Sequence, residues 1–287
     1  MCPVGRFTRH TGDMEVKVKA DLHVHTNISD SSLSVEETVK RAADKGATHL
    51  GIVDHDTTAG LEAAMECGRR HNIKIVPGIE ISAYSYEKMK KVHILGFCFD
   101  LAAPNINRIC RPILERRTAN SIKQAEILIK EGFDISVEDV LDKAKESTAV
   151  YKQHIMDVLV DKGYTDGIYS DLYMKYFKNN GACSGDIEYV NVFEAVKAIK
   201  TDGGFAILAH PGQLDSYDLI DALTAAGLDG LEACHQDHDS RDILQIMHYR
   251  QKYNFILTGG SDFHGRYGNS PDILGVEAPE EYIRYFC

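Results

Sequence analysis

Short runs of apolar, β-branched residues recur along the chain, and a segment with helix-like spacing follows each of them. Runs of this kind are typical of buried strands, and the spacing after them is typical of amphipathic helices. The alternation predicts a parallel α/β architecture. The expected strands lie at 20–25, 48–53, 73–79, 92–97, 205–209, 228–233 and 255–258.

The alternation stops for about a hundred residues between Phe97 and Phe205. Amphipathic segments follow one another there and predict helices near 106–131, 136–146, 149–162 and 168–178. We therefore expect a helical insertion, or cap, inside one larger domain. The predicted division is a domain of 18–100 and 190–287, a cap at 101–189 and an N-terminal tail at 1–17.

Composition narrows the classes of partner. The 287 residues are 44% hydrophobic and 26% charged, which is an ordinary globular balance. The net charge of -11 makes duplex nucleic acid and anionic membranes poor partners. Seven cysteines without a CxxC pair argue against a disulfide framework or a zinc ribbon. No run is long enough for a membrane span and no signal peptide is visible, so we expect a cytoplasmic protein.

Polar residues end the first expected strand. His23 and His25 are two residues apart and project from the same face, where two imidazoles can share a metal ion. Asp30 follows in the next loop and can add a carboxylate oxygen. Two histidines at this spacing occur more often by chance than as a metal site, so this motif alone does not establish that a metal binds.

The next strands repeat the pattern. Asp54, His55 and Asp56 stand where an apolar strand ends, and buried carboxylates there need a positive partner. Asp56 is also expected to be a helix N-cap. Glu80 and His93 lie between apolar neighbours, where each is as compatible with a satisfied core residue as with a ligand.

Two later strands end in the same way, with His210 and with the pair Asp262 and His264. Such residues at the carboxyl ends of successive strands gather at one face of a βα barrel. Ligands of this kind without thiolates suit zinc, manganese or iron, and they are too many for one ion. The predicted metal ligands are His23, His25, Asp30, His55, Glu80, His93, His210, Asp262 and His264.

The ordered motifs DLHVHT, VDH, PGIEIS, HILG, LAHP and GSDFHG resemble the PHP (polymerase and histidinol phosphatase) family over residues 18–276. The resemblance implies a distorted seven-stranded βα barrel with two or three divalent ions, manganese first and iron or zinc as alternatives. It also implies how the ligands are shared among the ions. One ion would bind His23, His25, Glu80 and Asp262, a second Glu80, His93 and His210, and a third Asp30, His55 and His264.

The resemblance further implies hydrolysis of phosphate esters by a metal-activated water. The leaving group needs a proton, for which His210, His154 and His235 are the candidates. The insertion resembles the cap of the small-molecule members, although Lys152-Gln153-His154 replaces their usual Arg-Pro-His. The expected substrate contacts are Arg116, Arg117, Asn120, Lys152 and His154. For Lys152 and the two arginines, solvated helix charges are an equal alternative.

The string from Tyr151 to Met156 resembles a subgroup linked to cyclic phosphoribose hydrolysis. This implies a small-molecule substrate, 5-phosphoribosyl 1,2-cyclic phosphate, opened and then dephosphorylated. The alternative is a nucleoside 3′,5′-bisphosphate. An amidohydrolase is disfavoured because Glu80 takes the place of a strand-end lysine, a nuclease by the net charge, and a non-catalytic scaffold by the complete ligand set.

Overall fold

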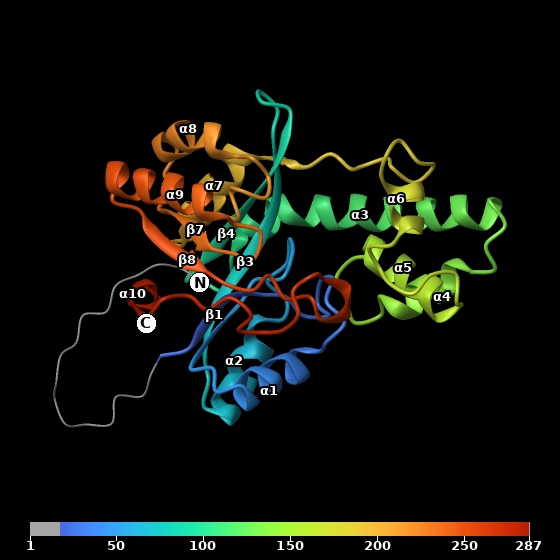
Figure 1. Ribbon diagram of the computed structural model, residues 1–287, viewed down its shortest axis with the longest axis horizontal. Coiled ribbons are helices and arrows are strands. Elements are labelled where there is room, and N and C mark those ends of the chain that lie inside the picture. The colour runs from blue at the N-terminus through green and yellow to red at the C-terminus, as the bar shows by residue number, and fades with distance from the viewer. Residues whose placement is uncertain (1–17, 287) are drawn as a thin grey trace.

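The computed structural model describes residues 18–286, so the predicted tail at 1–17 lies outside the described residues (Figure 1). All seven predicted strands are present in one curled sheet, in the order β1-β2-β3-β4-β6-β7-β8. A further strand of two residues, β5 (Val190–Asn191), pairs with β3. The main strands are β1 (Ala20–Val24), β2 (His49–Ile52), β3 (Lys74–Ser85), β4 (Lys90–Phe97), β6 (Phe205–Leu208), β7 (Gly230–Cys234) and β8 (Ile256–Gly259).

The sheet is not wholly parallel, and the expectation of a parallel architecture is wrong at β4. This strand runs antiparallel to both β3 and β6. Residues 86–89 alone separate β3 from β4. A parallel return needs a crossover of a dozen or more residues, whereas a hairpin needs only a short turn. The chain therefore forms a mixed barrel of the distorted PHP type.

The barrel closes loosely between its first and last strands. β1 and the chain after β8 meet at two isolated bridges, Val24 to Phe263 and Ala20 to Ala278. Two of the hydrogen bonds across the seam lie at the ligand-bearing segments: the His25 amide donates to the Phe263 carbonyl at 3.0 Å, and the Asp262 amide donates to the His23 carbonyl at 2.9 Å. The seam therefore brings two ligand-bearing segments side by side.

Helices cover the outside of the barrel (Figure 1). Ser34 and Glu37 form a reciprocal capping box at the start of α1, as their spacing predicts. Short 3-10 helices lie at Tyr217–Leu219 and Gly265–Tyr267. The α-helices of the barrel are α1 (Val35–Asp44), α2 (Leu61–His71), α7 (Val192–Thr201), α8 (Ile220–Ala225), α9 (Ser240–Tyr253) and α10 (Glu280–Ile283).

The four helices between β4 and β5, which we call the cap helices, match the predicted helices of the insertion. They are α3 (Pro104–Lys130), α4 (Val137–Lys143), α5 (Lys152–Asp161) and α6 (Asp171–Phe177). The long helix α3 leaves the barrel, and α4, α5 and α6 gather along its outer part (Figure 1). Ile106 of α3 belongs to the barrel core, whereas Leu128 belongs to a separate hydrophobic cluster of the cap helices. The bounds 101–189 stay a prediction.

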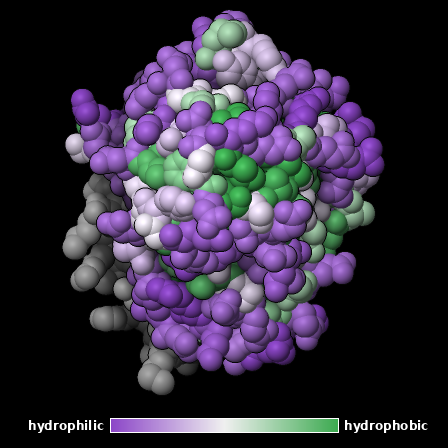
Figure 2. All heavy atoms as spheres, turned by 90° about the vertical axis from the view of Figure 1, so that its right-hand side faces the viewer, coloured by the Kyte–Doolittle hydropathy of each residue, from purple (hydrophilic) through white to green (hydrophobic). Residues whose placement is uncertain are grey.

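Seen from the end formed by the cap helices, hydrophobic residues form a band between polar ones (Figure 2). Among the described residues, no helix is both long enough and apolar enough to cross a bilayer.

The start of α3 depends on a carboxylate from another helix. Asp202, at the end of α7, accepts hydrogen bonds from the amides of Asn105 and Ile106 at 3.0 and 2.9 Å. Ala103, the residue before α3, offers no side-chain cap. Asp202 therefore anchors α3 to the barrel by satisfying amides that the helix leaves free.

We expect Asp202→Ala to lower the free energy of unfolding by about 1–3 kcal/mol, because two partly buried amides lose their acceptor. Urea unfolding measures this loss. Asp142→Ala, at an exposed site on α4, is the control and should leave the urea midpoint unchanged. Equal midpoints for both variants would show that Asp202 does not anchor α3.

Candidate metal centre

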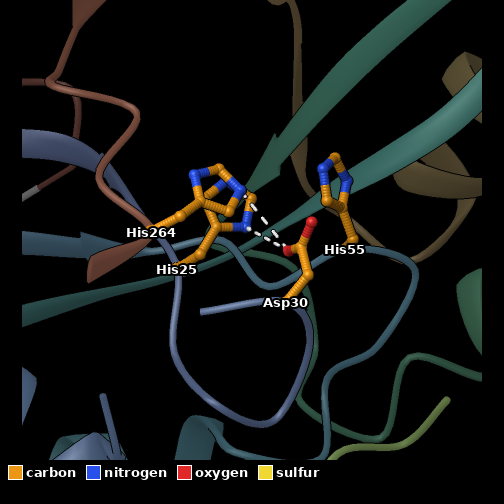
Figure 3. A group of neighbouring side chains, drawn as sticks. All are labelled: His25, Asp30, His55 and His264. Atoms are coloured by element: carbon orange, nitrogen blue, oxygen red, sulfur yellow. Dashed lines mark ion pairs between the residues drawn. The ribbon is translucent and has the colours of Figure 1, made fainter. Parts of the chain in front are cut away.

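Eight of the nine predicted metal ligands fall into three overlapping groups at one end of the barrel, and the ninth, His210, has its Nε2 2.9 Å from Glu80 Oε1. Within each group, one ligand atom of every residue lies within 4.8 Å of the others. The His264 group, drawn in Figure 3, takes its side chains from three segments of the chain: the loop after β1, which carries His25 and Asp30, and the segments of His55 and His264. The groups are the Asp262 group (His23, His25, Glu80 and Asp262), the His93 group (His55, Glu80 and His93) and the His264 group (His25, Asp30, His55 and His264).

Glu80 lies at the centre of the nine ligands. Its Oε1 is 2.8 Å from His93 Nδ1 and 2.9 Å from His210 Nε2. Its Oε2 is 3.3 Å from His23 Nε2 and 3.2 Å from His25 Nε2. Oε2 also lies 3.4 Å from His55 Nδ1, so the two oxygens face different sets of imidazoles, and Glu80 belongs to two of the ligand groups.

Several strand-end residues adopt a backbone conformation that L-residues rarely adopt. Asp262 has φ of 53°, Asp56 has φ of 58° and His210 has φ of 24°. A positive φ at a residue other than glycine costs about 1–3 kcal/mol and persists only where its surroundings enforce it. Hydrogen bonds from neighbouring segments enforce it at Asp262 and His210, whose amides donate to the His23 carbonyl and to Glu232.

The polar atoms of this centre fit metal ions. Buried nitrogen and oxygen atoms normally have hydrogen-bond partners. Within residues 18–286, several buried ligand atoms have none, including both ring nitrogens of His25, Oδ1 of Asp30 and Nδ1 of His55. A set of imidazoles and carboxylates without a thiolate suits zinc, manganese or iron. The residues present therefore fit the divalent ions that the sequence predicts.

Burial and neighbouring charges shift the titration of these ligands. Burial lowers the pKa of His55 to about 3, so its imidazole is neutral, as a metal ligand must be. Burial opposes a charge on His25, but contacts with Asp262 and Glu80 raise its pKa to about 10. Burial alone would raise the pKa of Glu80, yet the surrounding imidazoles hold it well below its usual range. A cation that enters must therefore displace protons shared by these histidines.

One carboxylate that orients the ligands was missed in the sequence. The carboxylate of Glu232, on β7, lies 2.9 Å from His23 Nδ1 and accepts a hydrogen bond of 2.9 Å from the backbone amide of His210. It is fully buried. A carboxylate that fixes the ring of a ligating histidine is a frequent partner of metal sites. The signal was available, because Glu232 lies in an apolar strand just as Glu80 does.

The two aspartates beside His55 have different partners. Asp54 accepts bonds from the amide and hydroxyl of Thr26, both at 2.7 Å, and so holds the loop that leads to Asp30. Asp56 accepts the Ser82 amide at 2.8 Å and pairs with Arg117 at 2.7 Å. The expectation that Asp56 caps a helix is wrong, because α2 begins after Gly60 and without a side-chain cap.

A cavity of about 490 Å³ joins the metal centre to the cap helices. Asp30, His55 and His93 line its inner part. Three of the predicted substrate contacts, Arg117, Asn120 and Lys152, also line it.

The other predicted contacts lie elsewhere. Arg116 is 44% exposed and donates to the Glu188 carbonyl at 2.9 Å, away from the cavity lining. His154 is buried, accepts the Tyr151 amide at Nδ1 and packs its ring against Tyr267. Burial lowers the pKa of His154 to about 4.

The remaining predicted proton donors lie beside the metal ligands. His235 is buried, and its Nε2 is 3.5 Å from Asp262 Oδ2. Burial opposes protonation of His235, but the contact with Asp262 raises its pKa. His210 has its Nε2 at Glu80, which makes it a better ligand than proton donor.

A mixed barrel with such a ligand set at its strand ends is the fold and site of a metal-dependent hydrolytic enzyme. The chain matches the PHP domain over residues 21–255 and belongs to the PHP domain family, which confirms the resemblance. It superposes with a TM-score of 0.86 on the crystal structure of a Bifidobacterium adolescentis protein assigned as a metal-dependent phosphoesterase. The two are 28% identical, and the match covers 93% of this chain and 94% of the other.

Curated relatives carry more specific names. The chain is 45% identical to the phosphoribosyl 1,2-cyclic phosphate 1,2-diphosphodiesterase of Eggerthella lenta, over 90% of this chain and 98% of the relative. It is 28% identical to the 3′,5′-nucleoside bisphosphate phosphatase of Chromobacterium violaceum, over 90% and 91%. It is 30% identical to the 5′-3′ exoribonuclease Rnm of Salmonella typhimurium, over 88% and 87%.

Replacement of Glu80 by Ala should remove the carboxylate that the Asp262 group and the His93 group share. We expect the bound metal per chain, measured by elemental analysis, to fall by at least one ion and hydrolysis of any phosphate ester to be abolished. Glu87→Ala, at a largely exposed site on the turn after β3, is the matched control. Full metal content and turnover in Glu80→Ala would contradict a bridging role.

Proposed function

We propose that this protein hydrolyses a cyclic phosphate of phosphoribose in two steps, first as a phosphodiesterase and then as a phosphatase. The carrying observation is the cavity between the predicted metal ligands and the cap helices, which is lined by the half-buried amine of Lys152. Lys152 lines this cavity, and burial lowers its pKa. Within the described chain, the Lys152 ammonium has no ion pair, so an anionic substrate would supply one. The name of the Eggerthella lenta relative supports the same substrate.

We propose two or three divalent ions at this centre, with manganese first and iron or zinc as alternatives. The Asp262 group would hold one, Glu80 with His93 and His210 a second, and the His264 group a third. When bound, such ions lower the pKa of a water and offset the charge on the phosphoryl oxygens.

The substrate has two phosphoryl groups, which suit the two ends of the cavity. The cyclic phosphodiester would lie at the ligand end, where water adds to phosphorus and one ring P–O bond breaks. The alkoxide that leaves takes a proton, and a second water then releases inorganic phosphate from the monoester. The remote phosphate would lie at Lys152, where charge-assisted contacts are worth about 1.5–3 kcal/mol each.

Among the three predicted proton donors, the position of His235 suits the role best. His154 is buried away from the cavity lining, and its lowered pKa leaves the ring neutral near pH 7. His235 lies beside the predicted ligands, with its Nε2 3.5 Å from Asp262 Oδ2. Its buried Nε2 also lacks a hydrogen-bond partner among the described residues. We therefore assign proton donation to His235.

The choice of substrate is tested by incubation with Mn²⁺ and phosphorus NMR. We expect 5-phosphoribosyl 1,2-cyclic phosphate to yield a monoester and then inorganic phosphate. A nucleoside 3′,5′-bisphosphate is the alternative, and a short 5′-phosphorylated RNA tests nuclease action. No reaction on the cyclic ester, together with rapid release from either of the other two, would overturn the proposal.

The role of Lys152 is tested by measuring how its replacement changes the KM for the substrate. Lys152→Ala should raise KM for the phosphoribosyl substrate roughly 10–100-fold, the loss of one charge-assisted contact, and leave a generic aryl phosphate nearly unaffected. Lys145→Ala, an exposed lysine just beyond α4, should change neither value. Equal losses on both substrates would mean that Lys152 acts at the reacting phosphate or in folding.

A further inference from the structure

The first turn of α5 and the residue before it contact two ligand-bearing segments of the His264 group. The Tyr151 hydroxyl donates to the His55 carbonyl at 3.0 Å. The Gln153 amide nitrogen, Nε2, donates to Asp30 Oδ2 at 3.0 Å. A helix of the cap thus reaches into the metal centre itself.

The two oxygens of Asp30 have different surroundings. Oδ2 accepts the bond from Gln153. Oδ1 faces the imidazoles, 3.4 Å from His264 Nε2 and 3.9 Å from His25 Nδ1 (Figure 3). Oδ1 is buried and has no hydrogen-bond partner within residues 18–286. The carboxylate is therefore held by one oxygen and presents the other to the place where an ion would bind.

A second contact of the same helix secures the opposite side of the group. Asp157 lies one turn after Gln153, on the same face of α5. It pairs with Arg266 at 2.6 Å and accepts the Tyr267 hydroxyl at 2.8 Å. Both partners follow His264 closely in the chain. This anchor holds α5 in place independently of Gln153.

The segment before α5 is fastened to the loop that leads to Asp30. The Ser147 hydroxyl donates to the Ser29 carbonyl at 2.6 Å, and the Thr148 amide donates to the Ile28 carbonyl at 2.9 Å. Because these main-chain contacts already join the cap to the loop, the Gln153 bond is not needed as an anchor. Its specific consequence is the orientation of the Asp30 carboxylate.

We propose that Gln153 is a positioning residue that fixes Asp30 as a one-oxygen ligand, so that ion binding by the His264 group depends on the cap. This inference rests on the metal centre of the proposed function. Without the amide, Asp30 can rotate and offer both oxygens or neither. Loss of such an orienting bond typically weakens metal binding about 10–100-fold. The Asp262 and His93 groups make no contact with Gln153 and should keep their affinity.

The test is a titration of metal-free protein with Mn²⁺ that resolves the successive binding steps. Gln153→Met preserves the length of the side chain and removes the donor. His264→Ala marks the step that belongs to the His264 group, since His264 is absent from the other groups. Asp161→Asn is the matched control, because Asp161 lies on the same face of α5 and, among residues 18–286, forms its ion pair with Lys143 at the surface. Urea unfolding of the metal-free proteins checks that all variants fold.

We expect Gln153→Met to weaken about 10–100-fold the one step that His264→Ala abolishes, and to leave the other steps unchanged. The control should bind as the unaltered protein does. Unchanged binding at that step in Gln153→Met overturns the inference while the metal centre stands. Equal weakening of every step overturns it as well, since that is the result of a general loss of structure. If the unaltered protein shows no step sensitive to His264→Ala, the third ion of the proposed function fails, and the inference fails with it.

Discussion

The carboxylate of Glu80, buried among imidazoles, is the interaction on which this structure depends. A buried carboxylate without a partner costs several kcal/mol, and this one is 1% exposed. Its two oxygens divide the surrounding histidines into two sets, and its own strand lies between β2 and β4 in the sheet. Strands from both halves of the barrel must therefore converge on one residue, which explains why ligands far apart in sequence share this end of the fold.

The carboxylates around this centre form a second layer of constraint. Glu232 fixes His23 and the backbone of His210, and Asp54 holds the loop before Asp30. The positive φ of His210 persists under its bond to Glu232, and that of Asp262 under its bond to the His23 carbonyl. The loose seam between β1 and β8 lets the Asp262 segment pair with β1 at the main chain. The distortion of the barrel is thus what admits the ligands of the last strand to the centre.

The strands and helices could be predicted from the sequence, whereas the contacts between side chains far apart in the sequence could not. Apolar runs located the strands and amphipathic spacing located the cap helices, because burial imposes those patterns directly. The direction of β4 was mispredicted, since it depends on a four-residue turn. The ligand residues were visible as polar strand ends, but Asp56 was taken for a helix cap because its partner, Arg117, lies in a distant helix. Arg116 was predicted to contact substrate but lies at Glu188 instead. The sequence alone does not show which side of α3 faces the cavity, because that depends on how the helix packs in the fold.

The cavity is lined by positively charged side chains although the protein as a whole is acidic. The chain carries a net charge of -11, yet the cavity is lined by Lys91, Lys152, Lys178 and Arg117. Two of these cations are compensated within the protein, because Lys91 pairs with Asp186 and Arg117 with Asp56. An acidic surface repels long polyanions, while a cavity lined by uncompensated cations attracts short ones. A small ester with two phosphoryl groups satisfies both conditions, since it fits inside the cavity and leaves no charged chain along the surface.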